Sequence, residues 1–222
     1  MSGNSLAIPK QKDLLMQKFA RVTGVAAVLN KDNIDTDAII PVSWMRSPDS
    51  DLGRGLFGNW RYDANGNEVS DFVLNWPNRR NSRFIVAGAN FGCGSSREAA
   101  VWALARFGVR CVIAPSFSDI FLENSFKNGL LPVTLPAPDV KWLVDSLSVS
   151  MDSVLTVDLE KCIVEVPGSR SISFSLPPTR RIALLERLDE ISTTLRQVAD
   201  VDAYQRRDEA ERPWIHLRRE RE

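Results

Sequence analysis

A glycine-rich stretch, residues 88–98, is the feature that most constrains this chain. It reads Gly-Ala-Asn-Phe-Gly-Cys-Gly-Ser-Ser-Arg-Glu. The apolar run before it, residues 83–87, is typical of a β-strand, and residues 99–107 carry apolar side chains at helical spacing. A second β-type run follows at residues 109–114. Strand, tight loop, helix and strand in this order predict a βαβ unit with parallel strands and a right-handed crossover, and therefore an α/β fold.

The loop between the first strand and the helix has the composition of an anion site. Backbone N–H groups at a helix N-terminus carry the positive end of the helix dipole, which suits a carboxylate. Arg97 could bind that carboxylate with two parallel hydrogen bonds, and Ser95 lies in the same positive field. A purely structural alternative is a capping box, in which Ser95 caps the helix and Glu98 reaches back. Neither the G-x-G-x-x-G fingerprint nor a P-loop is present.

A second polar motif, Asp35-Thr36-Asp37, follows the first expected strand, residues 22–29. Its two carboxylates flank a hydroxyl group. They could bind a cation, orient a catalytic histidine, or form an Asx turn. Taken alone, the motif is most simply a turn.

Composition excludes several functional classes. The chain has 222 residues, of which 44% are hydrophobic, and this size and composition fit one soluble domain. Its formal net charge is zero, which argues against a protein that binds nucleic acid by neutralising phosphates. Cys93, Cys111 and Cys162 are far apart, so neither a disulfide framework nor a metal site is indicated. No apolar run is long enough for a signal peptide or a membrane span. We expect a cytoplasmic protein that binds neither nucleic acid nor membranes.

The remaining sequence predicts further elements and one long irregular segment. Residues 43–81 are expected to form a long loop that contains a short helix near residues 55–62 and a strand at 72–74. An amphipathic helix at residues 180–197 is expected to pack its apolar stripe into the core. Further strands are expected at residues 130–133, 154–158, 162–167 and 171–174, and further helices at 116–128 and 141–148.

Several motifs together resemble the small-subunit family of the isopropylmalate dehydratases, in the aconitase superfamily. The residues that carry the resemblance are 35–41 (Asp-Thr-Asp-Ala-Ile-Ile-Pro), 53–57 (Gly-Arg-Gly-Leu-Phe), 88–98, 114–121 (Ala-Pro-Ser-Phe-Ser-Asp-Ile-Phe) and 124–132 (Asn-Ser-Phe-Lys-Asn-Gly-Leu-Leu-Pro). This combination is specific, and it overturns the structural interpretation of the serine loop.

The resemblance implies a layered β/β/α swivel-type domain whose βαβ unit carries the Gly-Ser-Ser-Arg loop. It covers residues 16–204. Residues 1–15 have no counterpart and are expected to form a flexible N-terminal extension, and residues 205–222 a charged C-terminal tail.

The resemblance also implies a hydro-lyase that interconverts 2-isopropylmalate and 3-isopropylmalate through isopropylmaleate, in leucine biosynthesis. This chain would bind no cofactor. A partner large subunit, in a heterodimer or heterotetramer, would hold a four-iron four-sulfur cluster that acts as a Lewis acid on the leaving hydroxyl group.

Individual roles follow from the same resemblance. Ser95 would act as the base in its alkoxide form. Ser96 and Arg97 would bind the carboxylates of the dicarboxylate substrate. Asp37 would support a histidine of the partner. Arg46 and Arg54, in a loop at residues 42–58 that would close over the substrate, are further substrate-binding candidates.

One departure from the family pattern leaves alternatives open. Members of the family usually continue Arg-Glu-His, where this chain has Ala99. The chain could therefore serve another small diacid, such as methylmalate, citraconate or dimethylmaleate. A non-catalytic anion-binding assembly module is a further alternative.

Overall fold

The computed structural model describes residues 18–47, 50–95, 97–149, 153–188 and 190–215. Contacts divide the chain into a unit that ends at Arg187 and a second that begins at Leu188. The expected extension at residues 1–15 lies outside the described residues, and the expected boundary at residue 204 falls inside a helix of the second unit. Among the described residues, no helix combines the length and the apolar character that crossing a bilayer requires.

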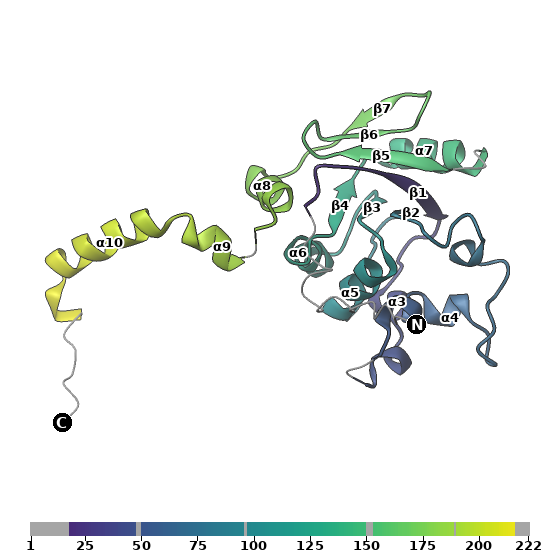
Figure 1. The fold of residues 1–222 in the computed structure, drawn as a ribbon, viewed down its shortest axis with the longest axis horizontal. Helices are drawn as coiled ribbons and strands as arrows, with labels where there is room; N and C mark the ends of the chain where they lie inside the picture. The colour runs from purple at the N-terminus through teal and green to yellow at the C-terminus, as the bar shows by residue number, and fades with distance from the viewer. Residues whose placement is uncertain (1–17, 48–49, 96, 150–152, 189, 216–222) are drawn as a thin grey trace, which may run out of the picture. The chain divides into compact units, whose positions relative to one another are not determined.

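The first unit is built on a seven-stranded sheet in the order β4-β3-β2-β1-β5-β6-β7 (Figure 1). The first four strands run parallel, and β5, β6 and β7 add in antiparallel fashion. The strands are β1 (Arg21–Leu29), β2 (Phe84–Ala87), β3 (Cys111–Ala114), β4 (Leu131–Thr134), β5 (Val154–Asp158), β6 (Ile163–Glu165) and β7 (Ser171–Ser173).

The helices of this unit cover both faces of the sheet (Figure 1). One hydrophobic cluster packs α2, α3 and α5 on one face, and another packs α7 and α8 on the opposite face. The helices are α2 (Thr36–Ile39), α3 (Leu52–Gly55), α4 (Gly58–Arg61), α5 (Glu98–Phe107), α6 (Asp119–Lys127), α7 (Ala137–Val149) and α8 (Pro178–Glu186), with 3₁₀ turns η1 (Val42–Met45) and η2 (Val73–Asn75).

The predicted βαβ unit is confirmed as β2-α5-β3. Phe84 pairs with Cys111, and Cys111 pairs with Leu131, all in parallel register. Every residue of β2 and β3 is buried, as expected for parallel strands that are covered on both faces. Gly108 ends α5 in the left-handed conformation, with φ of 109°.

Two predictions about local structure are wrong. Residues 72–74 do not form a strand, because Phe72 is the N-cap of η2 and accepts a hydrogen bond from Asn75 N–H within that 3₁₀ turn. The single helix expected at residues 180–197 is broken, because Arg187 adopts a left-handed φ of 60° that ends α8. In α8 only Leu184 is buried.

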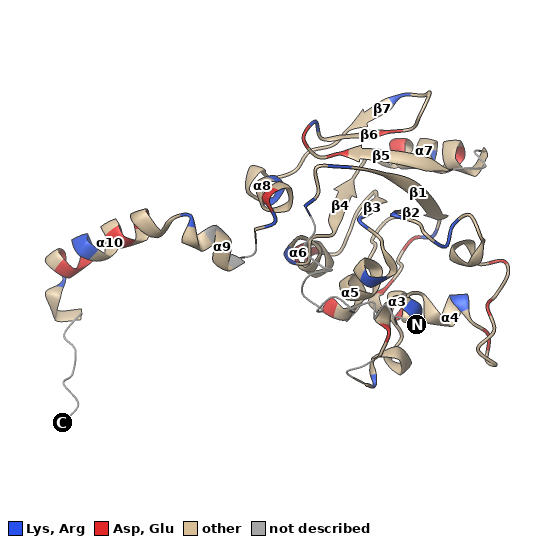
Figure 2. Cartoon of the chain, viewed as in Figure 1, with Lys and Arg blue, Asp and Glu red and all other residues tan. Residues whose placement is uncertain are grey.

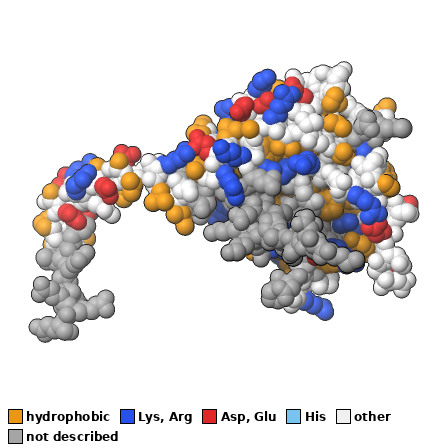
Figure 3. All heavy atoms as spheres, viewed as in Figure 1, with side chains coloured by type: hydrophobic (Ala, Val, Ile, Leu, Met, Phe, Trp, Pro, Cys, Tyr) orange, Lys and Arg blue, Asp and Glu red, His pale blue; other side chains and the backbone are white. Residues whose placement is uncertain are grey.

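The second unit, described by itself, contains α9 (Glu190–Leu195), α10 (Val198–Glu211) and η3 (Pro213–Ile215). No residue of α10 is buried. On α9, the apolar stripe that was expected in the core is also exposed: Ile191 is 70% exposed and Leu195 is 62% exposed. Apolar side chains on this unit are visible at the surface in Figure 3. The sequence pattern predicted the helical period but not the burial.

Charged side chains of both signs are interspersed along the described helices, strands and loops (Figure 2). Several form exposed ion pairs, such as Arg170 with Asp139 and Lys141 with Asp145. Pairs of this kind contribute little to stability.

Candidate active site

Three loops meet at the carboxyl ends of the parallel strands. Gly92 N–H donates to Ile34 O (2.7 Å), and Thr36 N–H donates to Cys93 O (2.9 Å), which joins the loops after β1 and β2. Phe91 N–H donates to Ser116 O (3.0 Å), which adds the loop after β3. Open α/β sheets bind ligands at this edge.

The loop after β2 can approach its neighbours because glycine occupies its tightest positions. Gly92 has φ of +76°, and a Cβ there would lie only 2.2 Å from Cγ of Phe121. Gly94 has φ of +89°, and its Cβ would lie 3.3 Å from Cβ of Asp35. Both the left-handed backbone and the lack of space favour glycine. The sequence analysis found these glycines but not the aromatic ring that packs on one of them.

The Asp35-Thr36-Asp37 motif divides its carboxylates between two tasks. The Asp35 side chain caps α2 by accepting a hydrogen bond from Ala38 N–H (2.7 Å), so the turn interpretation is confirmed for this residue. Asp37, two residues later, pairs its carboxylate with Arg97, and its side chain stays half exposed.

The structure brings Ser95, Asp37 and Arg97 together. The Arg97 guanidinium forms an ion pair with the Asp37 carboxylate. The Ser95 side chain is exposed, and its Oγ lies 3.5 Å from Oγ1 of Thr36. Ser96 lies outside the described residues. Thr36 is the member that sequence reasoning missed, although its position between two carboxylates was a signal.

The capping box, the structural alternative that the family resemblance set aside, does not form. Helix α5 begins at Glu98, its N-cap residue is Arg97, and Arg97 makes no side-chain capping bond. Glu98 instead accepts a hydrogen bond from Asn128 (2.9 Å), on α6's C-terminal side. Ser95 is thus not used to cap α5. The first-turn N–H groups of a helix lack intrahelical partners and attract anions.

Of the two loop arginines, Arg54 lies away from Ser95. Arg54 is on α3, with its guanidinium 6.0 Å from the centre of the Trp44 ring, and Arg46 is exposed after η1. Helix α3 approaches the C-terminal end of α5, where a Cβ on Gly53 would lie 2.9 Å from the Arg106 carbonyl carbon. A ten-residue helix spans about 15 Å, so α3 lies at the end of α5 remote from Ser95.

A buried arginine orders the long loop that contains these residues. Arg61 Nε donates to Asn75 Oδ1 (3.1 Å), and Asn75 Nδ2 donates back to Arg61 O (2.8 Å). Burial lowers the pKa of the Arg61 guanidinium, which nonetheless stays charged, because the ordinary value is so high. The irregular sequence therefore folds into a defined scaffold.

The residues that the structure describes do not offer a metal site. No group of three or more His, Cys, Asp or Glu side chains converges among them. Cys111 is buried in β3, where burial raises its pKa well above the ordinary value, while Cys93 and Cys162 are half-buried in separate loops. This donor set does not fit an iron–sulfur cluster held by the described part of the chain alone.

Comparisons with known proteins identify the family of the chain. Residues 16–138 match the family described as the aconitase C-terminal domain. The chain is 48% identical over 201 residues to the 3-isopropylmalate dehydratase small subunit of Dinoroseobacter shibae, covering 90% of this chain and all of that one. It is 49% identical to the same subunit of Rhodospirillum centenum, over 90% of this chain and 98% of that one.

A solved structure is also similar. It is the crystal structure of 3-isopropylmalate dehydratase from Methanocaldococcus jannaschii, which matches with a TM-score of 0.59 and 26% sequence identity. The match covers 82% of this chain and 99% of that chain.

Proposed function

The chain belongs to the family of 3-isopropylmalate dehydratase small subunits, built on the aconitase C-terminal domain, and from this membership we propose its reaction. It is the small subunit of a hydro-lyase that interconverts 2-isopropylmalate and 3-isopropylmalate through isopropylmaleate, in leucine biosynthesis. The observation that carries the proposal is the cluster of Ser95, Thr36, Arg97 and Asp37 at the carboxyl edge of the parallel strands.

Ser95 is the proposed base. The proton to be removed lies next to a substrate carboxylate, and a free serine hydroxyl is too weak an acid to supply an alkoxide near neutral pH. A preorganised positive environment lowers that cost, as an oxyanion hole does. The N-terminus of α5, where the N-cap residue Arg97 makes no side-chain capping bond, and the Arg97 guanidinium supply such an environment beside the exposed Ser95 hydroxyl.

Arg97 is the proposed carboxylate ligand, together with Ser96. In the isolated chain Arg97 is paired with Asp37. Substrate binding therefore requires the guanidinium to exchange one carboxylate for another, a step that is nearly balanced in charge. Asp37 then becomes available to support a histidine of the large subunit, which is the role the family resemblance gives it. Arg46 and Arg54 stay predictions as substrate ligands.

A large subunit completes the enzyme. The family name implies such a partner, and the stoichiometry, heterodimer or heterotetramer, is part of our proposal. We assign the four-iron four-sulfur cluster to that partner, as the family resemblance implies. We place the assembly in the cytoplasm.

The decisive test is coexpression with the large subunit under anaerobic conditions, followed by turnover of isopropylmaleate, citraconate and dimethylmaleate. Ser95→Ala is expected to lower kcat on isopropylmaleate by about a thousandfold, because general-base catalysis contributes on this order. Ser173→Ala, which changes an exposed serine on β7, is the control and should leave kcat unchanged.

Each alternative has its own outcome in this assay. Turnover of citraconate or dimethylmaleate alone would assign the chain to a paralogous dehydratase. Failure of the assembled pair to hydrate any of the three would favour an anion-binding assembly module. Normal kcat in the Ser95→Ala variant would refute the assignment of the base.

A further inference from the structure

The sequence contains two Asn-Gly dipeptides, and the structure places them in opposite environments. Asn65-Gly66 lies in an exposed turn of the loop that follows α4 (Figure 1). Asn128-Gly129 lies at the C-terminal end of α6, where Asn128 is buried. Because the two dipeptides are identical, a difference in their chemistry must come from the fold.

An asparagine followed by glycine can react with its own backbone. The glycine nitrogen, after losing its proton to water, forms a bond to Cγ of the asparagine. The Cγ–Nδ2 bond then breaks, and Nδ2 takes up a proton and leaves as ammonia. A water molecule opens the resulting succinimide ring at either carbonyl group, which gives an aspartate or an isoaspartate. The reaction needs an asparagine side chain that is free to turn, and glycine leaves the attacking nitrogen unhindered because it has no Cβ.

The Asn65 side chain is free to adopt the reactive conformation. Asn65 is exposed, and among the residues that the structure describes its side-chain amide has no hydrogen-bond partner. No atom lies within 4 Å of the position that a Cβ on Gly66 would take, so the ring has room to form. Gly66 N–H donates to Asp63 O (3.0 Å), an exposed bond of the kind that opens at small cost. The reaction at Asn65 should therefore run close to its rate in an unfolded chain.

The backbone of the same turn is held by one carboxylate. Asp63 accepts hydrogen bonds from the backbone N–H groups of Asn65 and Asn67 (both 2.8 Å) and from Nδ2 of Asn67 (3.2 Å). These bonds, above all those from Asn67, lower the pKa of the Asp63 carboxyl group. The carboxylate thus fixes the residues on both sides of Gly66 and leaves the Asn65 side chain outside its hydrogen bonds.

The second dipeptide is held in the opposite way. Asn128 Oδ1 accepts from Trp102 Nε1 (3.1 Å), and Asn128 Nδ2 donates to Glu98 Oε1 and to Asn124 O (both 2.9 Å). Gly129 has a positive φ of 72°, like the 80° of Gly66, so the backbone conformation of the glycine does not separate the two sites. The difference lies in the bonds of the asparagine side chain.

We propose that Asn65 is a site of spontaneous deamidation and that the fold protects Asn128 from the same reaction. The change adds a negative charge at position 65, beside the Asp63 carboxylate. The isoaspartate product also inserts one carbon atom into the backbone of a turn that Asp63 N–H closes by donating to Asn67 O (2.9 Å), and should loosen it. The inference is independent of the proposed function.

The test follows single residues by peptide mass and fragmentation after the full-length protein is incubated in mildly alkaline buffer. The readout is the mass gained when NH₂ is exchanged for OH. In the folded protein Asn65 should react roughly a hundredfold faster than Asn128, because three hydrogen bonds must break before the Asn128 amide can turn. In urea the two sites should react at similar rates, since only the dipeptide then matters.

Two variants sharpen the result. Gly66→Ala places a methyl group in open space, where it hinders the attacking nitrogen, and should slow the reaction at Asn65 roughly tenfold. Trp102→Phe removes one bond from Asn128 and should raise the rate there several-fold while leaving Asn65 unchanged. Equal rates at the two sites in the folded protein, or a rate at Asn65 that rises in urea as steeply as that at Asn128, would overturn the proposal.

Discussion

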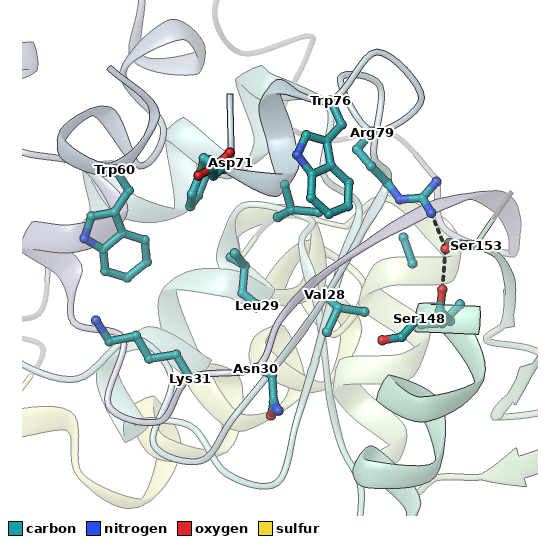
Figure 4. A pocket seen from close by; sticks show the side chains of 14 residues that line it. Val28, Leu29, Asn30, Lys31, Trp60, Asp71, Trp76, Arg79, Ser148 and Ser153 are labelled. Atoms are coloured by element: carbon teal, nitrogen blue, oxygen red, sulfur yellow. Dashed lines mark hydrogen bonds between the residues drawn. The ribbon is translucent and has the colours of Figure 1, made fainter. Parts of the chain in front are cut away.

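The two sides of β1 differ sharply at the strand's carboxyl end. On the β2 side, the loops after three strands are joined by backbone hydrogen bonds, and glycines allow them to pack without space between them. On the β5 side, the described pairing stops at Val25 and Val154, and a cavity with two tryptophans in its wall lies beside the strand (Figure 4). One strand end thus borders both a closed, preorganised site and a cavity.

The difference follows from the direction of the strands. Parallel neighbours end at the same edge, so their loops meet and can hydrogen-bond to each other. The antiparallel neighbour β5 runs in the opposite direction, so its carboxyl end lies at the other edge of the sheet. Substitutions on the closed side should therefore reduce the stability of the isolated subunit.

The largest stability effect is expected at Gly92. Gly92→Ala combines a left-handed φ with a Cβ that would lie 2.2 Å from the Phe121 ring, and should lower the free energy of unfolding by about 2–4 kcal/mol. Urea unfolding of the small subunit alone measures this. Gly66→Ala is the matched control, with φ of +80° and open space around the added methyl group. If both variants lost the same stability, the close packing of the loop would not matter.

A pH effect is expected next, from Cys111 in the parallel half of the sheet. Burial raises the pKa of this thiol, so it stays neutral in the folded protein while the unfolded thiol ionises above about pH 8.5. Above that pH the unfolded state binds fewer protons, and the free energy of unfolding falls by up to ~1.4 kcal/mol per pH unit until the folded pKa is reached.

Urea unfolding of the wild type and of Cys111→Ala between pH 7.5 and 10 isolates this contribution. The wild type should lose stability more steeply than the variant, although the variant is less stable throughout because of its cavity. Parallel slopes would show that Cys111 does not ionise differentially.

The smallest effect is expected at the cap of α2. Asp35→Ala removes the bond to Ala38 N–H and should cost about 1 kcal/mol. Asp51→Ala removes an equivalent cap, to Arg54 N–H on α3, and should cost about the same. Turnover of the assembled enzyme should fall more for Asp35→Ala than for Asp51→Ala, since α2 positions Thr36 and Asp37. Equal turnover in the two variants would show that the cap of α2 does not position Thr36 and Asp37 for the reaction.

Sequence reasoning succeeded where a pattern is local. The apolar runs around residues 88–98 predicted the βαβ unit, and the quoted motifs predicted the family, which is confirmed. It failed where the outcome depends on distant partners. The Ser-x-x-Glu spacing suggested a capping box, but Glu98 bonds Asn128, thirty residues away in sequence. The apolar stripe after Arg187 has helical spacing yet is exposed.

The sequence by itself determined the β2-α5-β3 unit with its parallel strands and the loop that carries Ser95, because these are encoded in short-range periodicity and glycine placement. Only the tertiary structure decided that Arg97 meets Asp37, sixty positions earlier, and that Glu98 bonds Asn128. Both depend on how separate strands and their loops are brought together in the sheet, which no local pattern specifies.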